Sequence, residues 1–289
     1  KALAQAHIYP HPRAPQLLEA LADLTGLSSD HLIATNGVDS LLAYIFMAFS
    51  SEETRVLTSQ GSFIGTYVNA QKLNISVDTV PLKAYAYDLD AMALAIRPET
   101  GIIYLANPNN PTGTPILKND LEAFMKKVPQ DVVVILDEAY FEYAKDFDDY
   151  PNGVELLSMY NNLVLTRTMS KAYGMAGLRV GDGMADPGLI TEVQKVKLPF
   201  EPSGISQAAA IAALQDEDFL QETINLNREG MLYFVEQFDR LALSYVRNSY
   251  ANFFMLVFED EIKADHFTNQ CLERGLILRY LDRFGLPNC

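Results

Sequence analysis

A lysine close to two hydroxyl groups and an arginine is the first feature of this sequence that could perform chemistry. Thr168, Ser170, Lys171 and Arg179 lie within one short segment. A lysine amine can bond covalently to an aldehyde, and hydroxyls and a guanidinium bind phosphate. A surface lysine is the simplest explanation of a lone Ser-Lys pair, but the flanking residues favour a ligand site. We therefore expect a ligand that carries an aldehyde and a phosphate.

An aspartate follows the most apolar of the predicted strands. Val132–Leu136 is apolar at every position, as expected of a strand that is buried on both faces of a parallel sheet. Asp137 comes next, and a buried carboxylate needs a cation or a hydrogen-bond donor. The protonated nitrogen of a pyridine ring would meet that need. A structural ion pair with a nearby Lys or Arg is the alternative.

Two other segments could contact the same ligand. Asn107–Gly113 is a proline-rich turn, and its Asn110 could reach one phenolate oxygen together with Tyr140 if their strands are neighbours. Phe63 could stack on a ring, although it could equally be a core aromatic residue. Pyridoxal 5'-phosphate needs a lysine for its aldehyde, an acid for its ring nitrogen, donors for its phenolate and a cradle for its phosphate. The sequence therefore predicts a site for this cofactor.

A turn near the N-terminus is a second candidate for binding the phosphate. Asn36-Gly37-Val38-Asp39 opens a segment of strong helical period, and the first turn of a helix offers free backbone N–H groups to an anion. The Asp39 side chain could simply be an acid that favours the helix N-terminus. The glycines around Gly181 and Gly183 do not form a dinucleotide motif, because Asp186 stands where its third glycine would be.

The pattern of the chain indicates how these residues are positioned. Apolar β-rich runs alternate with helical segments through the first two thirds, which predicts an α/β fold with a mostly parallel sheet covered by helices. Ligand sites in such sheets lie at the carboxyl ends of the strands. The predicted strands are Arg55–Ser59, Ile75–Val80, Ile102–Ala106, Val132–Leu136 and Leu163–Thr166, and the predicted helices are Val38–Phe49, Ile64–Lys72, Lys118–Lys127 and Gly188–Lys197.

The last quarter of the chain predicts a smaller α+β unit. A long helix is expected across Phe219–Arg240, followed by strands at Asn252–Phe258 and Leu276–Tyr280 with a helix between them. We expect a large cofactor-binding domain over residues 31–215 and a small C-terminal domain over residues 216–289. Residues 1–30 would belong to the small domain or to a dimer contact.

Composition narrows the classes of partner. The chain has 289 residues, 49% of them hydrophobic, and a formal net charge of −15. This charge disfavours nucleic acids and anionic membranes as partners. The apolar runs are shorter than the roughly 18 residues of a membrane span, and the scattered histidines predict no metal site. Two cysteines, Cys271 and Cys289, in a chain of this length indicate a reducing compartment, so we expect a cytoplasmic location.

Taken together, these segments resemble the class I/II aminotransferases of fold type I, and most closely the histidinol-phosphate aminotransferase family. The resemblance extends from Tyr9 to Pro287, and Asn107–Gly113 and Ser170–Arg179 are its most specific parts. It implies a homodimer with shared active sites, in which Tyr9 reaches the phosphate in the neighbouring subunit. It also implies that Arg279 faces the anionic tail of the substrate.

The resemblance also implies a role for each candidate residue. Lys171 would carry the cofactor as an internal aldimine and act in catalysis with Asp137 and Tyr140. Asn110 would contact both the phenolate and the substrate, and Phe63 would stack on the ring. The phosphate would be held by Gly37, Val38, Asp39, Thr168, Ser170 and Arg179.

The implied reaction is reversible transamination between histidinol phosphate and 2-oxoglutarate. An aromatic amino acid aminotransferase, a decarboxylase of phosphorylated amino acids and a catalytically silent cofactor-binding regulator are the alternatives. In the family, an arginine for the substrate is expected about two positions after Cys289, and a short N-terminal substrate segment is expected before Lys1. The sequence therefore suggests a trimmed chain.

Overall fold

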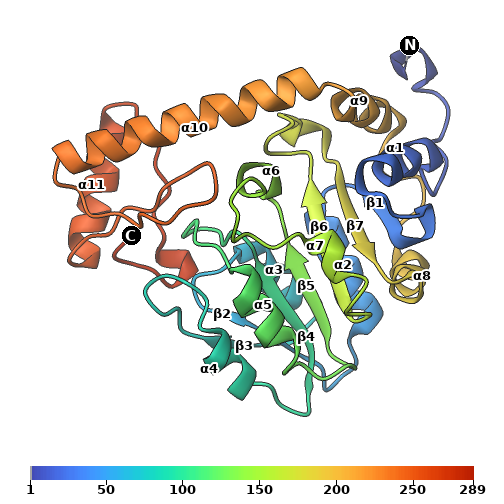
Figure 1. Ribbon diagram of the computed structural model, residues 1–289, viewed down its shortest axis with the longest axis horizontal. Helices are drawn as coiled ribbons and strands as arrows, with labels where there is room; N and C mark the ends of the chain where they lie inside the picture. Colours follow the sequence, from blue (N-terminus) through green and yellow to red (C-terminus); the bar gives the residue numbers. More distant parts are fainter. Residues whose placement is uncertain (1) are drawn as a thin grey trace.

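A single sheet between two layers of helices forms the body of the protein (Figure 1). The computed structural model describes residues 2–289, and within them seven strands pair in the order β1-β7-β6-β5-β4-β2-β3. Only β7 is antiparallel to its neighbours. The strands are β1 (Leu32–Thr35), β2 (Arg55–Ser59), β3 (Ser76–Val80), β4 (Thr100–Ala106), β5 (Val133–Asp137), β6 (Leu163–Thr168) and β7 (Gly181–Ala185).

The central strand is β5, and every one of its residues is buried. It runs parallel to β4 on one side and β6 on the other, with Asp137 opposite Ala106 and Thr166. The three strands therefore end at the same edge of the sheet. This alignment brings the segments that follow them together, as the sequence predicts.

Helices cover both faces of the sheet. On one face α2, α3 and α8 enclose a core with Phe46 and Ile135, and on the other α1, α4, α5 and α9 enclose a core with Leu105 and Leu136. The α-helices of this body are α1 (Pro15–Thr25), α2 (Val38–Phe49), α3 (Ile64–Lys72), α4 (Leu89–Leu94), α5 (Lys118–Met125), α6 (Phe141–Ala144), α7 (Gly153–Leu156), α8 (Pro187–Val196) and α9 (Gly204–Leu214). Short 3-10 helices occupy Ala2–Gln5, Ser29–His31, Ala176–Leu178 and Asp282–Phe284.

The predicted α/β architecture is confirmed, but strands β1 and β7 were not predicted from the sequence pattern. Helices α2 and α3 and strand β2 have the predicted bounds, and the other predicted strands and helices of the first 240 residues shift by one or two residues at their ends. Strand β7 was not predicted because two of its five residues are glycines. They are needed there: a Cβ at Gly181 would lie 2.6 Å from the backbone nitrogen of Val38, and one at Gly183 would lie 2.8 Å from Leu41.

The C-terminal region is organised by α10 (Glu217–Arg240), which runs along one side of the molecule toward α11 (Glu261–Glu273) (Figure 1). The prediction of regular strands at Asn252–Phe258 and Leu276–Tyr280 is wrong for the described residues. An isolated bridge between Tyr245 and Leu256 is the only pairing there. Two backbone hydrogen bonds, from Val246 to Met255 and from Val257 to Ser244, flank this bridge, but within residues 2–289 no further pairs extend it into a ladder. The domain boundary near residue 215 stays a prediction.

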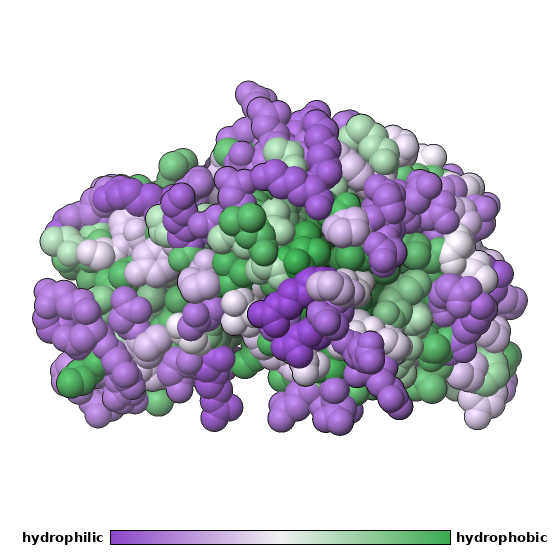
Figure 2. Space-filling view, turned by 90° about the horizontal axis from the view of Figure 1, so that it is seen from below, coloured by the Kyte–Doolittle hydropathy of each residue, from purple (hydrophilic) through white to green (hydrophobic). Residues whose placement is uncertain are grey.

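The surface combines polar side chains with scattered apolar ones, as the face in Figure 2 shows. Among residues 2–289, no helix is long and apolar enough to cross a bilayer. Both Cys271 and Cys289 are free thiols, and Cys289 is buried in a small C-terminal cluster with Val246, Met255 and Leu281.

Candidate active site

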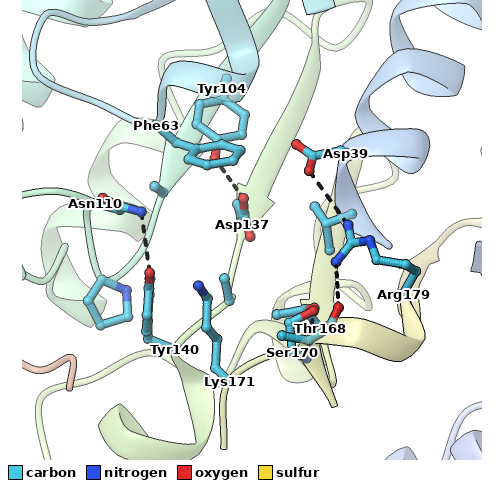
Figure 3. Close-up of a pocket in the computed structure, with 15 residues that line it drawn as sticks. Asp39, Phe63, Tyr104, Asn110, Asp137, Tyr140, Thr168, Ser170, Lys171 and Arg179 are labelled. Carbon is cyan, nitrogen blue, oxygen red and sulfur yellow. Dashed lines mark hydrogen bonds and ion pairs between the residues drawn. The ribbon is translucent and has the colours of Figure 1, made fainter. Parts of the chain in front are cut away.

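A cavity of about 250 Å³ lies where β4, β5 and β6 end, beside the N-terminus of α2 (Figure 3). Most of the residues that the sequence singles out line this cavity. Those from the first part of the chain are Val38, Asp39, Phe63 and Asn110. Those from the second part are Asp137, Tyr140, Thr168, Ser170, Lys171 and Arg179.

The carboxyl group of Asp137 forms the floor of the cavity. It is buried at the end of β5, and its Oδ2 accepts a hydrogen bond of 2.6 Å from the hydroxyl of Tyr104. Its Oδ1 has no hydrogen-bond partner among residues 2–289. Burial raises the pKa of Asp137 to about 6, although the Tyr104 hydrogen bond acts in the opposite direction. The site therefore contains an acid with one free acceptor, which suits a cationic N–H group.

Tyr104 is the functional neighbour that sequence reasoning missed. It lies inside an apolar strand, where its ring is indistinguishable from a core residue. A fully buried tyrosine hydroxyl nevertheless needs a partner, and Tyr104 has an exposed fraction of 0%. Ala106 pairs with Asp137 across the strands and lies two residues after Tyr104, so the Tyr104 and Ala106 side chains share a face of β4. The pairing of β4 with β5 is therefore what identifies Tyr104 as a neighbour of Asp137.

Lys171 enters the cavity from the loop after β6 (Figure 3). Its Nζ lies 5.4 Å from the ring centroid of Tyr140. The amine therefore faces the same space as the Asp137 carboxylate but makes no ion pair with it. An amine and a carboxylate that share a cavity without neutralising each other leave room for a third group between them.

Tyr140 and Asn110 meet at one wall, as their places after neighbouring strands predict. The Nδ2 of Asn110 donates to the Tyr140 hydroxyl over 3.3 Å. Burial, with the nearby charge of Asp137, raises the pKa of Tyr140, so its hydroxyl stays a donor. The loop that carries Asn110 is fixed by the side chain of Asn107, which bonds both backbone groups of Ile116 at 2.8 and 3.0 Å.

The opposite end of the cavity is suited to an anion. Gly37 caps α2 with φ of 85°, and no side chain occupies the free N–H groups of its first turn. Arg179 reaches this turn: its Nη2 lies 3.7 Å from Asp39 Oδ2, and a Cβ at Gly37 would be 2.5 Å from that nitrogen. The Asp39 carboxylate would repel an anion, so its backbone is the part that suits one.

Two hydroxyls complete this end. Thr168 ends β6, and its Oγ1 donates to the Ser170 hydroxyl over 3.0 Å while accepting from the Ser170 backbone N–H over 3.1 Å. Both residues line the cavity near Arg179 (Figure 3). Hydroxyls, a guanidinium and a helix N-terminus together provide the donors that a phosphate requires.

Three predicted residues do not line the cavity: Gly37, which adjoins it as the residue before Val38, and Tyr9 and Arg279, which lie away from it. Tyr9 is exposed, with an exposed fraction of 78%, and its ring packs at 4.7 Å from that of Phe200. Arg279 is exposed within the irregular C-terminal segment. The structure brings neither side chain to the cavity, so their roles stay predictions.

Comparison with known proteins agrees with this geometry. The family described as Aminotransferase class I and II matches residues 2–289. A relative from Carboxydothermus hydrogenoformans named histidinol-phosphate aminotransferase 2 is 38% identical, over 100% of this chain and 79% of its own length. A histidinol-phosphate aminotransferase from Brevibacillus brevis is 40% identical, over 97% of this chain and 76% of its own.

A solved structure agrees as well. The histidinol-phosphate aminotransferase from Sinorhizobium meliloti, in complex with pyridoxal-5'-phosphate, superposes with a TM-score of 0.91. It is 30% identical and covers 96% of this chain and 76% of its own. The predicted fold type I architecture is thereby confirmed. On the match along residues 2–289 and on these relatives, the chain belongs to the class I and II aminotransferase family.

Proposed function

We propose that this aminotransferase uses pyridoxal 5'-phosphate to exchange the amino group of histidinol phosphate with 2-oxoglutarate. One observation carries the proposal. A single cavity holds the Lys171 amine, a buried oxygen of Asp137 without a partner, and a set of anion-binding groups around Arg179. We call this set, which is made of Thr168, Ser170, Arg179 and the first turn of α2, the anion cradle. The amine, the Asp137 oxygen and the anion cradle are the three anchors that the aldehyde, ring nitrogen and phosphate of this cofactor require.

The donor set fits the cofactor at each position. Asp137 Oδ1 would accept from the protonated ring nitrogen, and the Asn110 and Tyr140 pair would face the phenolate oxygen. Phe63 lines the same cavity and would cover the ring face. The phosphate would be held by Gly37, Val38, Asp39, Thr168, Ser170 and Arg179, with Asp39 contributing its backbone.

When bound, pyridoxal phosphate supplies an aldehyde that bonds amines and a ring that withdraws electrons from the substrate carbon. Lys171 would bond the aldehyde first and, once displaced by the substrate amine, would take a proton from the substrate carbon on its Nζ and deliver that proton to the carbon of the former aldehyde. Asp137 would hold the ring proton, and Tyr140 would orient the phenolate.

The choice of histidinol phosphate rests on the named relatives, which are 38% and 40% identical over nearly the whole chain. Arg279 would recognise the phosphate of this substrate, since its exposed guanidinium is free to bind an anion. Under this proposal, Arg279→Ala raises KM for histidinol phosphate and leaves the reaction of phenylalanine unchanged. Equal effects on both substrates would contradict the role of Arg279.

Members of this family act on amino and keto acids and typically form dimers. We propose that two copies of this chain share their sites through the segment around Tyr9. The exposed ring of Tyr9 packs on the exposed ring of Phe200, and their sequence neighbours Ile8 and Leu198 are exposed as well, so apolar surface is available here for a contact between copies. Light scattering during gel filtration would measure the mass, and a monomer at all concentrations would contradict this arrangement.

The first experiment is amino-group exchange measured with purified protein and pyridoxal phosphate. Histidinol phosphate with 2-oxoglutarate is expected to yield glutamate, with phenylalanine tested in parallel. Exchange with phenylalanine alone would instead support an aromatic aminotransferase, and release of carbon dioxide would support a decarboxylase. Cofactor binding without any amino-group exchange would instead support a catalytically silent regulatory protein that binds the cofactor.

A further inference from the structure

The hydroxyl of Tyr104 controls how Asp137 is presented to the cavity. Tyr104 lies on β4 opposite Ile135, and Asp137 follows two residues later on β5. Side chains two residues apart on a strand share a face, so the phenol ring extends along the sheet toward the carboxylate. Ala106 follows Tyr104 on the same face of β4 and lies directly opposite Asp137, and its small side chain leaves space for the contact. The result is a hydrogen bond of 2.6 Å that both partners make while fully enclosed.

This hydrogen bond has a defined direction. Burial and the adjacent Asp137 charge raise the pKa of Tyr104 well above its usual value, so the hydroxyl remains protonated and donates. It occupies Oδ2 of Asp137 and leaves Oδ1 without a partner among residues 2–289. A carboxylate fixed through one oxygen cannot rotate freely, so the other oxygen has a fixed position at the cavity wall (Figure 3).

We propose that Tyr104 is a positioning residue for the ring nitrogen of the cofactor: its hydroxyl holds Asp137 ionised through Oδ2 and directs Oδ1 into the cavity. The inference rests on the proposed cofactor. Tyr104 would be linked to the cofactor only through two successive hydrogen bonds, its own to Asp137 and that of the ring nitrogen to Asp137. It takes no part in the chemistry. Its role differs from that of Tyr140, whose hydroxyl would touch the cofactor directly.

The phenylalanine variant separates this role from a structural one. Tyr104→Phe keeps the ring that packs among Ile102, Ile135 and Val164 in the core. It also keeps the backbone carbonyl of Tyr104, which accepts a hydrogen bond of 2.9 Å from Thr58. Only the hydroxyl is lost. Burial then raises the pKa of Asp137 above its value of about 6, because the hydrogen bond that most strongly opposes the effect of burial is lost. The Thr166 hydroxyl and the Ala139 backbone N–H, which lower this pKa less, remain beside the carboxyl group.

The test compares two cofactors on the full-length protein after the bound cofactor has been removed. One is pyridoxal phosphate, and the other is 1-deazapyridoxal phosphate, in which a C–H group replaces the ring nitrogen. Tyr104→Phe is expected to weaken binding of pyridoxal phosphate roughly tenfold near neutral pH, because a charge-assisted hydrogen bond is impaired. Binding of the deaza compound is expected to stay the same. The loss for pyridoxal phosphate is expected to shrink as the pH rises and Asp137 ionises again.

A matched control uses another tyrosine hydroxyl, at the half-buried Tyr67. The Tyr67 hydroxyl donates to the Ser59 carbonyl over 2.8 Å and makes no contact with Asp137, so Tyr67→Phe should leave the ratio between the two cofactors unchanged. In an Asp137→Asn background, Tyr104→Phe should cause no further loss. Equal losses for both cofactors, unchanged binding of pyridoxal phosphate, or a variant that cannot fold would each overturn the proposal. If the wild-type protein binds neither cofactor, the proposed function fails instead.

Discussion

Two adjacent carboxyl groups at the end of β5 show what distinguishes a binding position from a structural one. Asp137 and Glu138 are both buried, and burial raises the pKa of each. Glu138 Oε2 accepts hydrogen bonds of 2.9 and 2.8 Å from Arg167, and its other oxygen is packed so close to Gly153 that a Cβ there would lie at 2.5 Å. Asp137 has a neutral partner and a second, buried oxygen without a hydrogen-bond partner among residues 2–289, and it lines the cavity.

Asp137 and Glu138 differ in the charge of their hydrogen-bond partner and in whether they line a cavity, and not in the depth of burial. Arg167 forms an ion pair with Glu138, which directly follows β5, and lies opposite Asp182 on β7. The arginine therefore already neutralises the Glu138 carboxylate inside the protein, while Arg167 and Asp182 themselves line a second cavity. Asp137 instead has a donor that cannot neutralise it, which leaves a place for a cation.

The largest expected effect is at the amine that shares the cavity with Asp137. Lys171→Ala should reduce amino-group exchange by about 10⁴-fold, because the proton donor and acceptor is removed. The melting temperature without cofactor should hardly change, because Lys171 is exposed to the cavity and makes no ion pair. Exchange at the native rate would show that another group performs the proton transfer.

Exchanging the two neighbouring acids for amides tests the comparison directly. Asp137→Asn should lower activity by about 10²-fold or more, since the ring proton loses its anionic partner, while the free energy of unfolding stays the same or increases. Glu138→Gln should lower the free energy of unfolding by about 3 kcal/mol, because Arg167 loses its charged partner inside the core. Urea denaturation and exchange rates measure both. Similar profiles for the two variants would refute the distinction.

A glycine beside the anion cradle should matter for binding, although it carries no chemistry. A Cβ at Gly181 would press within 2.6 Å of the Val38 backbone nitrogen, so Gly181→Ala should displace the start of α2. We expect a loss of about 1–3 kcal/mol in the free energy of unfolding and weaker binding of pyridoxal phosphate in a fluorescence titration. Gly230→Ala is the control: nothing lies within 4 Å, and alanine should stabilise the α10 helix.

The smallest expected effect is the dependence of the free energy of unfolding on pH, which we attribute to two buried carboxyl groups near Arg167. Burial raises the pKa of Asp182 and of Glu142 to about 7, whereas both groups ionise near pH 4 in an unfolded chain. Between about pH 4 and pH 7 the folded protein therefore binds more protons, and the free energy of unfolding should fall as the pH rises, levelling off above pH 7. We expect a difference on the order of 1 kcal/mol between pH 6.5 and pH 7.5.

Urea unfolding of the cofactor-saturated protein at these two values measures the effect. Asp182→Asn should reduce the decrease, and the change Asp131→Asn at an exposed position should leave it intact. A free energy of unfolding that rises over this range would contradict the assignment of these groups.

The sequence predicts the architecture well where local and global signals agree. The wholly apolar run that became β5, and the helix that begins at Val38, can be found from residue types alone because burial on both faces and helical period are local patterns. The convergence of Asn110, Asp137 and Lys171 on one cavity follows from the rule that parallel strands end together.

The remainder depends on pairings that are remote in the sequence. Strand β7 exists because glycines let it approach α2, a contact between residues more than a hundred positions apart. Tyr104 is recognisable as a site residue only from the register of β4 against β5. The two strands predicted in the C-terminal region have suitable composition, but a strand is defined by its neighbour, and the described residues provide only the isolated bridge between Tyr245 and Leu256.

The position of β7 also sets an order of events during protein synthesis. Strand β1, which leads into the anion cradle of α2, is joined to the rest of the sheet only through β7. The N-terminal part of the chain emerges from the ribosome first, yet β1 cannot take its place until residues 181–185 have been made. A nascent chain that ends before them already contains Lys171 and Asp137 but lacks the strand that fixes the phosphate site. The enzyme should therefore capture its cofactor only after residues 181–185 have left the ribosome and paired with β1.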